Sequence, residues 1–304
     1  MIKLNIHNET AALQVMVVGI AKNMGGVPSI EKCFDPKSKE HVLAGTYPKE
    51  KDCIKEMDAL VKVLDKYNIK VCRPENIEGL NQIFTRDIAF VIEDKLVIPN
   101  IIKNREKETA GIDKILNEIA KEDIIKMPKG ARAEGGDVIP WNEYIFVGYS
   151  EKEDFEKYTV ARTNKAGLEF LEISFSNKIV KGFELNKSDE NPKDNALHLD
   201  CCFQPIGKNM AIMYKEGFKN QSDVDFLTNY FGEENVIEVT KEEMYNMNCN
   251  VFSISEKVII SEKGFIRLNN ELRKRGFIVE EIPFLEIAKM EGLLRCSIIP
   301  LTRE

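Results

Sequence analysis

The feature that most constrains the fold of this chain is a repeat of apolar segments, each broken by a short polar turn. Four of these segments begin at residues 88, 138, 201 and 251, which gives a period of roughly fifty residues. Apolar, β-branched runs separated by a few polar residues are typical of β-hairpins. We therefore predict four hairpins, over Ile88–Ile98, Val138–Tyr149, Cys201–Tyr214 and Val251–Ser261.

The segments between the hairpins carry a helical period instead. Lys51–Tyr67 places Met57, Leu60 and Leu64 on one face and charged residues on the other. The same spacing predicts further helices over Thr109–Lys121, Lys165–Phe175, Asp223–Phe231 and Arg267–Arg275. Short strand candidates follow most of these helices, such as Lys70–Cys72, Val236–Val239 and Ile278–Ile282. The repeating unit is therefore strand–strand–helix–strand, which makes the chain an α/β protein.

The two ends of the chain supply the missing parts of a fifth unit. Ser297–Leu301 is apolar and lies where the next hairpin is due, but no partner strand follows it. The apolar segment Leu13–Ile20 has no partner near it in the sequence either. If these two strands pair, they close a ring of five units. Because no Gly/Ser-rich linker divides the chain, we predict a single domain over residues 1–304.

Polar residues occur at the same place in every repeat. The residue immediately before each successive hairpin or strand is Asp87, Asp137, Asp200, Asn250 and finally Cys296. Equivalent positions in a closed ring lie around its axis, so we expect one shared site there. His198 lies two residues before Asp200 and adds an imidazole to this set.

Composition limits the classes of function without naming one. The net charge is −7 and the lysines alternate with acids, which argues against nucleic acid as a partner. Seven cysteines show no CxxC spacing and there are only three histidines, so we expect no metal and no cofactor. No signal-peptide pattern and no apolar run of about 18 residues occurs, so we expect a cytoplasmic protein without a membrane partner.

Four short motifs, in order, carry a resemblance to a known superfamily. They are Phe84-Thr85-Arg86-Asp87, Glu134-Gly135-Gly136-Asp137, His198-Leu199-Asp200 and Arg295-Cys296. The chain resembles the guanidino-group-modifying enzymes from about Leu80 to Leu301. These include arginine deiminases, dimethylarginine dimethylaminohydrolases and amidinotransferases. The resemblance implies the pentein fold, a five-bladed α/β-propeller, which agrees with the ring of five units.

The resemblance also implies roles for the motif residues. Cys296 looks like the nucleophile that attacks the guanidinium carbon, His198 like the general acid and base, and Glu134 like the carboxylate that orients His198. Asp87 and Asp200 resemble the pair that binds the guanidinium nitrogens. Chemistry supports these roles, because carboxylates match the planar donors of a guanidinium and a histidine titrates near neutral pH.

For other residues near the motifs, the sequence indicates a role in substrate binding less strongly. Phe84 resembles a residue that lies against the guanidinium, a cation–π contact. Arg162 is the first candidate for binding a substrate carboxylate and Arg86 the second, while Asn250 is expected to face the shared site. Structural alternatives remain: Asp87 and Asp200 can cap turns, His198 can be a core residue, and Arg162 can be a surface residue. Glu134-Gly135-Gly136 can form a tight turn with positive φ, and Cys201 and Cys202 are expected to begin a buried strand.

Two features narrow the choice of substrate. In the related enzymes that act on dimethylarginine, the position that resembles Asp200 holds Lys or another non-acid. Asp200 therefore favours an unsubstituted guanidine such as arginine. Typical arginine deiminases also carry an extra helical domain, for which the stretch between Asp87 and Glu134 leaves no room. We favour a deiminase-like or dihydrolase-like hydrolase. The alternatives are an amidinotransferase, a dimethylarginine hydrolase and a non-enzymatic pentein. The expected partner is a small guanidino compound, and the oligomeric state stays open, with a homodimer as one alternative.

Overall fold

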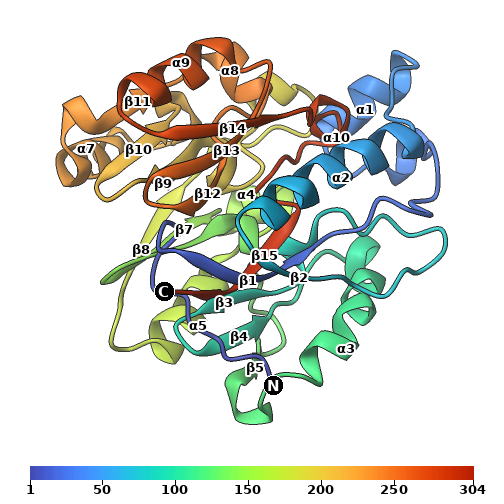
Figure 1. Ribbon diagram of the computed structural model, residues 1–304, viewed down its shortest axis with the longest axis horizontal. Helices are drawn as coiled ribbons and strands as arrows, with labels where there is room; N and C mark the ends of the chain where they lie inside the picture. Colours follow the sequence, from blue (N-terminus) through green and yellow to red (C-terminus); the bar gives the residue numbers. More distant parts are fainter.

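The chain folds into five separate three-stranded β-sheets, as the computed structural model of residues 1–304 shows (Figure 1). In every sheet two strands pair antiparallel and the third pairs parallel with the middle strand. Four sheets are continuous in sequence: β3 (Phe90–Ile92), β4 (Lys95–Ile98) and β5 (Ile124–Lys126); β6 (Val138–Trp141), β7 (Tyr144–Tyr149) and β8 (Ile179–Glu184); β9 (Phe203–Ile206), β10 (Met210–Met213) and β11 (Val236–Glu238); β12 (Phe252–Ser255), β13 (Val258–Glu262) and β14 (Ile278–Ile282). The four predicted hairpins are confirmed.

The fifth sheet joins the two ends of the chain. Its middle strand β1 (Leu13–Val18) pairs antiparallel with β15 (Ile298–Arg303) and parallel with β2 (Lys70–Cys72). Figure 1 shows the blue β1 beside the red β15. Each blade therefore has the same strand order, and the predicted five-bladed α/β-propeller is confirmed.

The helices are α1 (Pro36–Leu43), α2 (Glu50–Lys66), α3 (Asp113–Leu116), α4 (Lys152–Lys157), α5 (Lys165–Ser174), α6 (Leu199–Cys202), α7 (Gln221–Phe231), α8 (Lys241–Tyr245), α9 (Ile266–Lys274) and α10 (Leu285–Ala288). Most helices connect the second and third strands of a blade, whereas α6, α8 and α10 lie between one blade and the next. α2 buries Met57, Leu60 and Leu64, as its spacing predicted. No helix in the structure is long and apolar enough to cross a membrane.

Two local predictions were wrong. Thr109–Lys121 is not one α-helix, since a 3₁₀ segment over Lys103–Ile112 precedes the single turn of α3. Gly111 lies within this segment, and glycine is a poor α-helix former. Cys201 and Cys202 do not begin a strand but end α6, and their hairpin starts at Phe203.

The helix α1 was missed, although its sequence carries the signal. Asp35 caps its N-terminus by accepting a hydrogen bond from Ser38 N at 2.6 Å, and Pro36 follows as the first helical residue. This short helix positions the segment before it, which forms one wall of the site described below.

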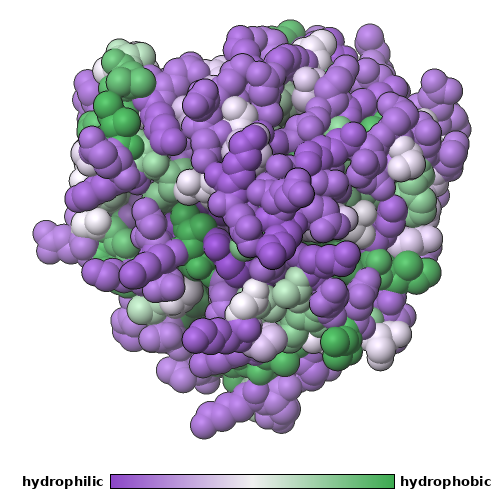
Figure 2. Space-filling view, turned by 180° about the vertical axis from the view of Figure 1, so that it is seen from behind, coloured by the Kyte–Doolittle hydropathy of each residue, from purple (hydrophilic) through white to green (hydrophobic).

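Apolar side chains pack into three buried clusters, of which the largest contains 55 residues. A cluster of 14 residues joins both chain ends to the first continuous blade, because it includes Ile6, Val17, Leu96 and Leu301. The outer surface seen in Figure 2 is mostly hydrophilic, with scattered apolar side chains. The core therefore follows the ring, and polar groups are buried mainly around its centre.

Candidate active site

Five of the predicted site residues line one cavity. The cavity has a volume of about 300 Å³, and Phe84, Asp87, His198 and Cys296 form part of its wall. Arg162 lines it as well. Because these residues come from four separate blades or blade connections, only the closed ring brings them together.

Cys296 lies just before β15 and its thiol faces this cavity. Asn250 Nδ2 lies 3.3 Å from Cys296 Sγ, and the oxygens of Asp200 lie 3.8 and 4.0 Å from it. Burial, and then the nearby charges of Asp200 and Asp87, raise the pKa of the Cys296 thiol well above its usual range. These surroundings therefore favour the thiol of Cys296 over its thiolate.

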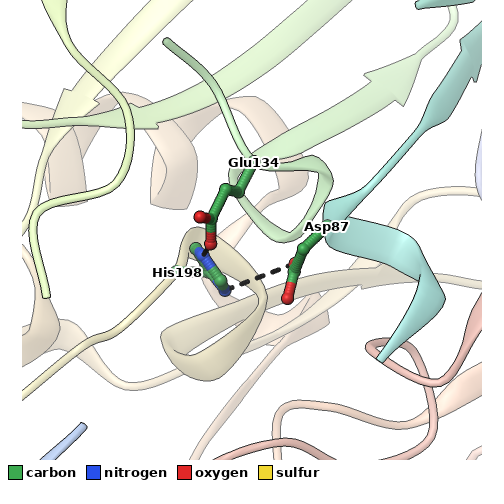
Figure 3. Close-up of side chains that lie close together, drawn as sticks. All are labelled: Asp87, Glu134 and His198. Atoms are coloured by element: carbon green, nitrogen blue, oxygen red, sulfur yellow. Dashed lines mark hydrogen bonds and ion pairs between the residues drawn. The ribbon is translucent and has the colours of Figure 1, made fainter. Parts of the chain in front are cut away.

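His198 is held by Glu134 and has one free ring nitrogen. Its Nε2 lies 3.0 Å from Glu134 Oε2, while Nδ1 has no hydrogen-bond partner and lies 3.8 Å from Asp87 Oδ1 (Figure 3). Burial alone would lower the pKa of His198, but Asp87, Asp137 and Glu134 outweigh it and raise the pKa. The imidazole is thus held in a state that readily carries a proton toward the cavity.

Glu134 is kept ionised by a buried arginine. Burial would raise its pKa, but Arg162 and the hydrogen bond from His198 lower it instead. Arg162 Nη1 lies 3.1 Å from Glu134 Oε2, and both side chains are fully buried. Glu134 can therefore fix the orientation of His198 in the way that its motif implies.

The glycines of the Glu134–Asp137 motif are needed for close packing, and the alternative of a positive-φ turn was wrong. Neither Gly135 nor Gly136 has a positive φ. A Cβ on Gly136 would lie 2.6 Å from His198 Nδ1, and one on Gly135 would lie 2.1 Å from the carbonyl oxygen of Arg86. Side chains here would displace the imidazole and the adjoining backbone.

Asp137 braces the segment that carries His198. Its Oδ1 accepts a hydrogen bond from Leu199 N at 2.9 Å, and its Oδ2 accepts one from Thr163 Oγ1 at 2.7 Å. Both oxygens of Asp137 therefore accept hydrogen bonds, and the residue stabilises the backbone next to His198.

Asp87 keeps one oxygen free beside the cavity. Arg105 Nη1 donates to Asp87 Oδ2 at 2.6 Å, whereas Asp87 Oδ1 has no partner. Glu108 holds Arg105 through two hydrogen bonds, of 2.9 and 2.7 Å. Arg105 and Glu108 line the cavity but were missed, because nothing in the sequence places the 3₁₀ segment that carries them beside Asp87.

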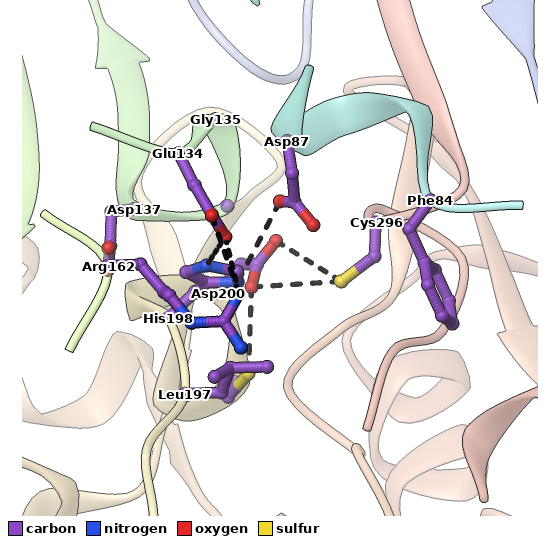
Figure 4. A network of polar contacts seen from close by, with 12 residues as sticks. Phe84, Asp87, Glu134, Gly135, Asp137, Arg162, Leu197, His198, Asp200 and Cys296 are labelled. Carbon is purple, nitrogen blue, oxygen red and sulfur yellow. Dashed lines mark hydrogen bonds and ion pairs between the residues drawn. The ribbon is translucent and has the colours of Figure 1, made fainter. Parts of the chain in front are cut away.

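Asp200 lies close to the sulfur but is not itself part of the cavity wall. It is fully buried, and Arg295 Nη1 donates to its Oδ2 at 2.9 Å. Figure 4 shows Asp200 beside Cys296. The Oδ1 of Asp200 has only thiol contacts, to Cys201 at 3.7 Å and Cys296 at 4.0 Å. Asp200 thus retains one oxygen without an N–H donor, next to Cys296. Its predicted contact with the guanidinium stays a prediction.

Asn250 contacts Cys296 and does not line the cavity. Its Oδ1 accepts hydrogen bonds from the backbone of Arg295 and Cys296, at 2.9 and 3.4 Å. Because Asn250 is fully buried and does not line the cavity, it positions Cys296 and is not placed to bind substrate directly.

Of the two arginines predicted to bind a substrate carboxylate, Arg162 lines the cavity and Arg86 does not. Arg86 is buried away from the cavity, with Glu9 as its ion-pair partner at 3.8 Å, so it is not available to a substrate. Arg162 lines the cavity, but its nitrogens donate to Thr159 O, Glu134 and Phe34 O. Phe84 lines the cavity as predicted, with its ring packed on Gly292, where a Cβ would lie 2.4 Å from the ring.

Three side chains are close enough to share a metal ion. Ligand atoms of Asp87, Glu134 and His198 lie within 4.8 Å of one another. Arg105 and Arg162 already pair with the two carboxylates, and their guanidinium charges repel a divalent cation. This donor set fits a proton-transfer site better than a metal centre, and the expectation of no metal stays a prediction.

Comparisons with known proteins agree with the geometry. The sequence model of the family described as N,N dimethylarginine dimethylhydrolase, eukaryotic, matches residues 43–303. An uncharacterised protein of Bacillus subtilis, YkgA, is 30% identical over 247 residues, which cover 80% of this chain and 78% of that protein. The propeller also matches the solved N-terminal domain of ArgZ, a cyanobacterial arginine dihydrolase. The TM-score is 0.78 at 17% identity, over 95% of this chain and 97% of that one.

A second structural match has a different activity. SxtG, an amidinotransferase from Microseira wollei, superimposes with a TM-score of 0.75 at 17% identity, covering 99% of this chain and 97% of its own. At these identities the two structural matches show the fold alone. From the family match and the four ordered motifs, the chain belongs to the N,N-dimethylarginine dimethylhydrolase family, within the guanidino-group-modifying enzymes of pentein fold.

Proposed function

We propose that the protein is a cysteine-dependent hydrolase that cleaves a C–N bond of an unsubstituted guanidino compound. One observation carries this proposal. Asp87 Oδ1, on the cavity wall, has no hydrogen-bond donor, and Asp200 Oδ1, 4.0 Å from Cys296 Sγ, has only thiol donors. A buried carboxylate oxygen without an N–H donor destabilises the folded protein. A substrate cation with planar N–H groups would supply donors to these oxygens.

The cation also accounts for activation of the nucleophile. Burial, and then the charges of Asp200 and Asp87, raise the pKa of Cys296. A guanidinium beside them offsets their charge and lowers the cost of forming the thiolate. Substrate binding and generation of the nucleophile are thus coupled.

The reaction then proceeds in two halves. Cys296 Sγ bonds to the guanidinium carbon, and the thiol proton passes through His198 to the leaving nitrogen as its C–N bond breaks. Water next gives a proton to His198 and bonds to the carbon, after which the C–S bond breaks and the thiol re-forms. The products are a urea-type compound and ammonium. Glu134 holds the imidazole in place throughout.

The amidinotransferase alternative uses the same residues. It differs only in that an amine, in place of water, attacks the covalent intermediate. The family description names dimethylarginine, but the free Asp200 Oδ1 favours a nitrogen that carries protons over one that carries methyl groups.

The test is incubation with several guanidino compounds, followed by mass spectrometry of products and protein. Arginine, agmatine and dimethylarginine are each supplied with and without an acceptor amine such as glycine. We expect ureido products, ammonium and a transient adduct on Cys296. Cys296→Ser should lose essentially all turnover while staying folded. A new guanidino product formed from the acceptor supports the transferase, faster cleavage of dimethylarginine contradicts the unsubstituted substrate, and an active Cys296→Ser enzyme contradicts the mechanism.

A further inference from the structure

The buried amide of Asn250 offers a hydrogen-bond donor to the sulfur of Cys296. Asn250 lies shortly before β12 and is fully buried, and its Nδ2 lies 3.3 Å from Cys296 Sγ. The other side-chain groups that bond to this sulfur are the two oxygens of Asp200, at 3.8 and 4.0 Å, and these act as acceptors. An amide N–H group can only donate. Asn250 is therefore the side chain that can stabilise the sulfur once it has lost its proton.

The orientation of this amide is fixed by its other three hydrogen bonds. Its Oδ1 accepts the backbone N–H groups of Arg295 and Cys296, at 2.9 and 3.4 Å. Its Nδ2 also donates to the carbonyl oxygen of Asp200 at 3.3 Å. An amide side chain has two donors and two acceptor sites, so all four are used. Rotation by 180° would place its N–H groups against two backbone N–H groups, and the Nδ2 of Asn250 is therefore held toward the sulfur.

The hydrogen bond from Asn250 favours the thiolate, which its acidic surroundings disfavour. Burial, and then the charges of Asp200 and Asp87, raise the pKa of the Cys296 thiol. A donor that points at the sulfur stabilises the charged form more than the neutral form. A lysine or arginine in this place would do the same, but its charge would repel a guanidinium beside Asp87. A neutral amide stabilises the thiolate without repelling the substrate.

We propose that Asn250 is a catalytic residue, whose Nδ2 donates a hydrogen bond to the thiolate of Cys296 in both halves of the reaction. This role rests on the proposed function. In the first half the hydrogen bond stabilises the thiolate that attacks the guanidinium carbon, while the thiol proton passes to His198. In the second half it stabilises the same thiolate as the C–S bond breaks. No covalent bond to Asn250 forms or breaks.

Two substitutions separate this hydrogen bond from the support that Asn250 gives to the backbone. Asn250→Asp keeps an oxygen for the two backbone N–H groups but replaces the donor by a second oxygen, whereas Asn250→Ala loses both. The measurement is the rate at which iodoacetamide, a neutral reagent, alkylates Cys296 at pH 8, followed by mass spectrometry of the Cys296 peptide. It needs no substrate, so its outcome does not depend on the proposed function.

Loss of a hydrogen bond to a charged group lowers the thiolate fraction about ten- to hundredfold. The remaining thiolate is more nucleophilic, which restores about half of that factor on a logarithmic scale. We therefore expect alkylation of Cys296 to slow about three- to tenfold in Asn250→Ala. It should slow further in Asn250→Asp, because the two backbone N–H groups favour an ionised carboxylate, whose charge repels the thiolate. The value of kcat should fall in the same order, and KM should change less than about threefold, because Asn250 does not line the cavity.

Asn164→Asp is the matched control. Asn164 Oδ1 also accepts two backbone N–H groups, from Arg132 at 3.0 Å and Gly167 at 2.9 Å, but this residue makes no hydrogen bond to Cys296. The substitution should leave alkylation of Cys296 within about twofold of the wild type. Cys53, fully buried in α2, reacts only in unfolded molecules, so its alkylation in the same digest measures the folded fraction.

Wild-type reactivity of Cys296 in Asn250→Asp, together with slow reaction in Asn250→Ala, would show that the amide only supports the backbone and would overturn the inference. If Asn250→Asp does not fold, Asn250→Ala is also treated with the larger reagent N-ethylmaleimide. Loss of the donor slows both reagents by a similar factor, because both react with the thiolate, whereas a changed ratio between them would indicate a displaced sulfur and overturn the inference. If no guanidino compound forms product or a Cys296 adduct, the proposed function fails, and the catalytic role of Asn250 fails with it even where the alkylation rates follow the expected order.

Discussion

At the scale of single residues, the backbone at Gly136 leaves no room for a side chain beside His198. Because a Cβ there would lie 2.6 Å from His198 Nδ1, Gly136→Ala should push the imidazole away from the cavity. A displacement of about 1 Å in an active site costs about a hundredfold in rate, and we expect at least that loss in kcat/KM. Activity assays and circular dichroism on the purified variant check this.

Gly276→Ala is the control for this variant. It also replaces a glycine, but the space around its Cβ is open, and its φ of 89° makes the substitution strained. It should lower stability and leave kcat/KM unchanged. Normal turnover in Gly136→Ala would show that His198 tolerates displacement and would contradict its assigned geometry.

At the scale of elements, a buried carboxyl on α2 holds the start of α10. Glu56 accepts hydrogen bonds from Glu286 N at 2.9 Å and Ile287 N at 2.8 Å, and burial raises its pKa to about 7. A carboxyl whose pKa is raised on folding binds its proton more tightly in the folded state. Its contribution to stability is therefore fully present below the unfolded pKa of 4.5 and is lost as pH rises through about 7. The loss amounts to at most about 3 kcal/mol.

Urea unfolding between pH 4.5 and 8 measures this effect. The free energy of unfolding of the wild type should fall more steeply with pH than that of Glu56→Gln, which has no proton to lose. Glu78→Gln, at an exposed carboxyl, should follow the wild type. Parallel curves for the wild type and Glu56→Gln would reject the raised pKa.

At the scale of the whole molecule, stability depends on closing the ring with the two ends of the chain. Leu301, in β15, is fully buried in the cluster that also contains Ile6, Val17 and Leu96. Leu301→Ala should lower the free energy of unfolding by about 2–5 kcal/mol. Leu43→Ala, at an exposed leucine of α1, should change it by less than about 0.5 kcal/mol.

The same experiment tests the predicted single domain over residues 1–304. Trp141, the only tryptophan, lies in β6 of a different blade and reports on unfolding there by its fluorescence. In the wild type and in Leu301→Ala we expect one transition, coincident by fluorescence and far-ultraviolet circular dichroism. Separate transitions would divide the chain into independent units.

Much of this fold and part of its site could be predicted from the sequence alone. Hydrophobic periodicity is local, so the hairpins, the helix α2 and the unpaired end strands were visible in it. The shared phase of Asp87, Asp200 and Cys296 then placed them in one site once the ring was closed. The sequence thus predicted the architecture, together with the residues that we propose as nucleophile and as acid and base.

Only the tertiary structure determined which charged side chains form ion pairs. Ion pairs such as Arg105 with Asp87, or Arg295 with Asp200, join segments that carry no common pattern. The need for Gly136 arises from the position of His198 in another blade. Asp35 and Glu291 come from near opposite ends of the chain and line the same cavity, and no sequence period connects them. Periodicity records the burial of each element against the core, whereas side-chain charge pairing is set by the packing of elements against one another, and that packing exists only after the ring has closed.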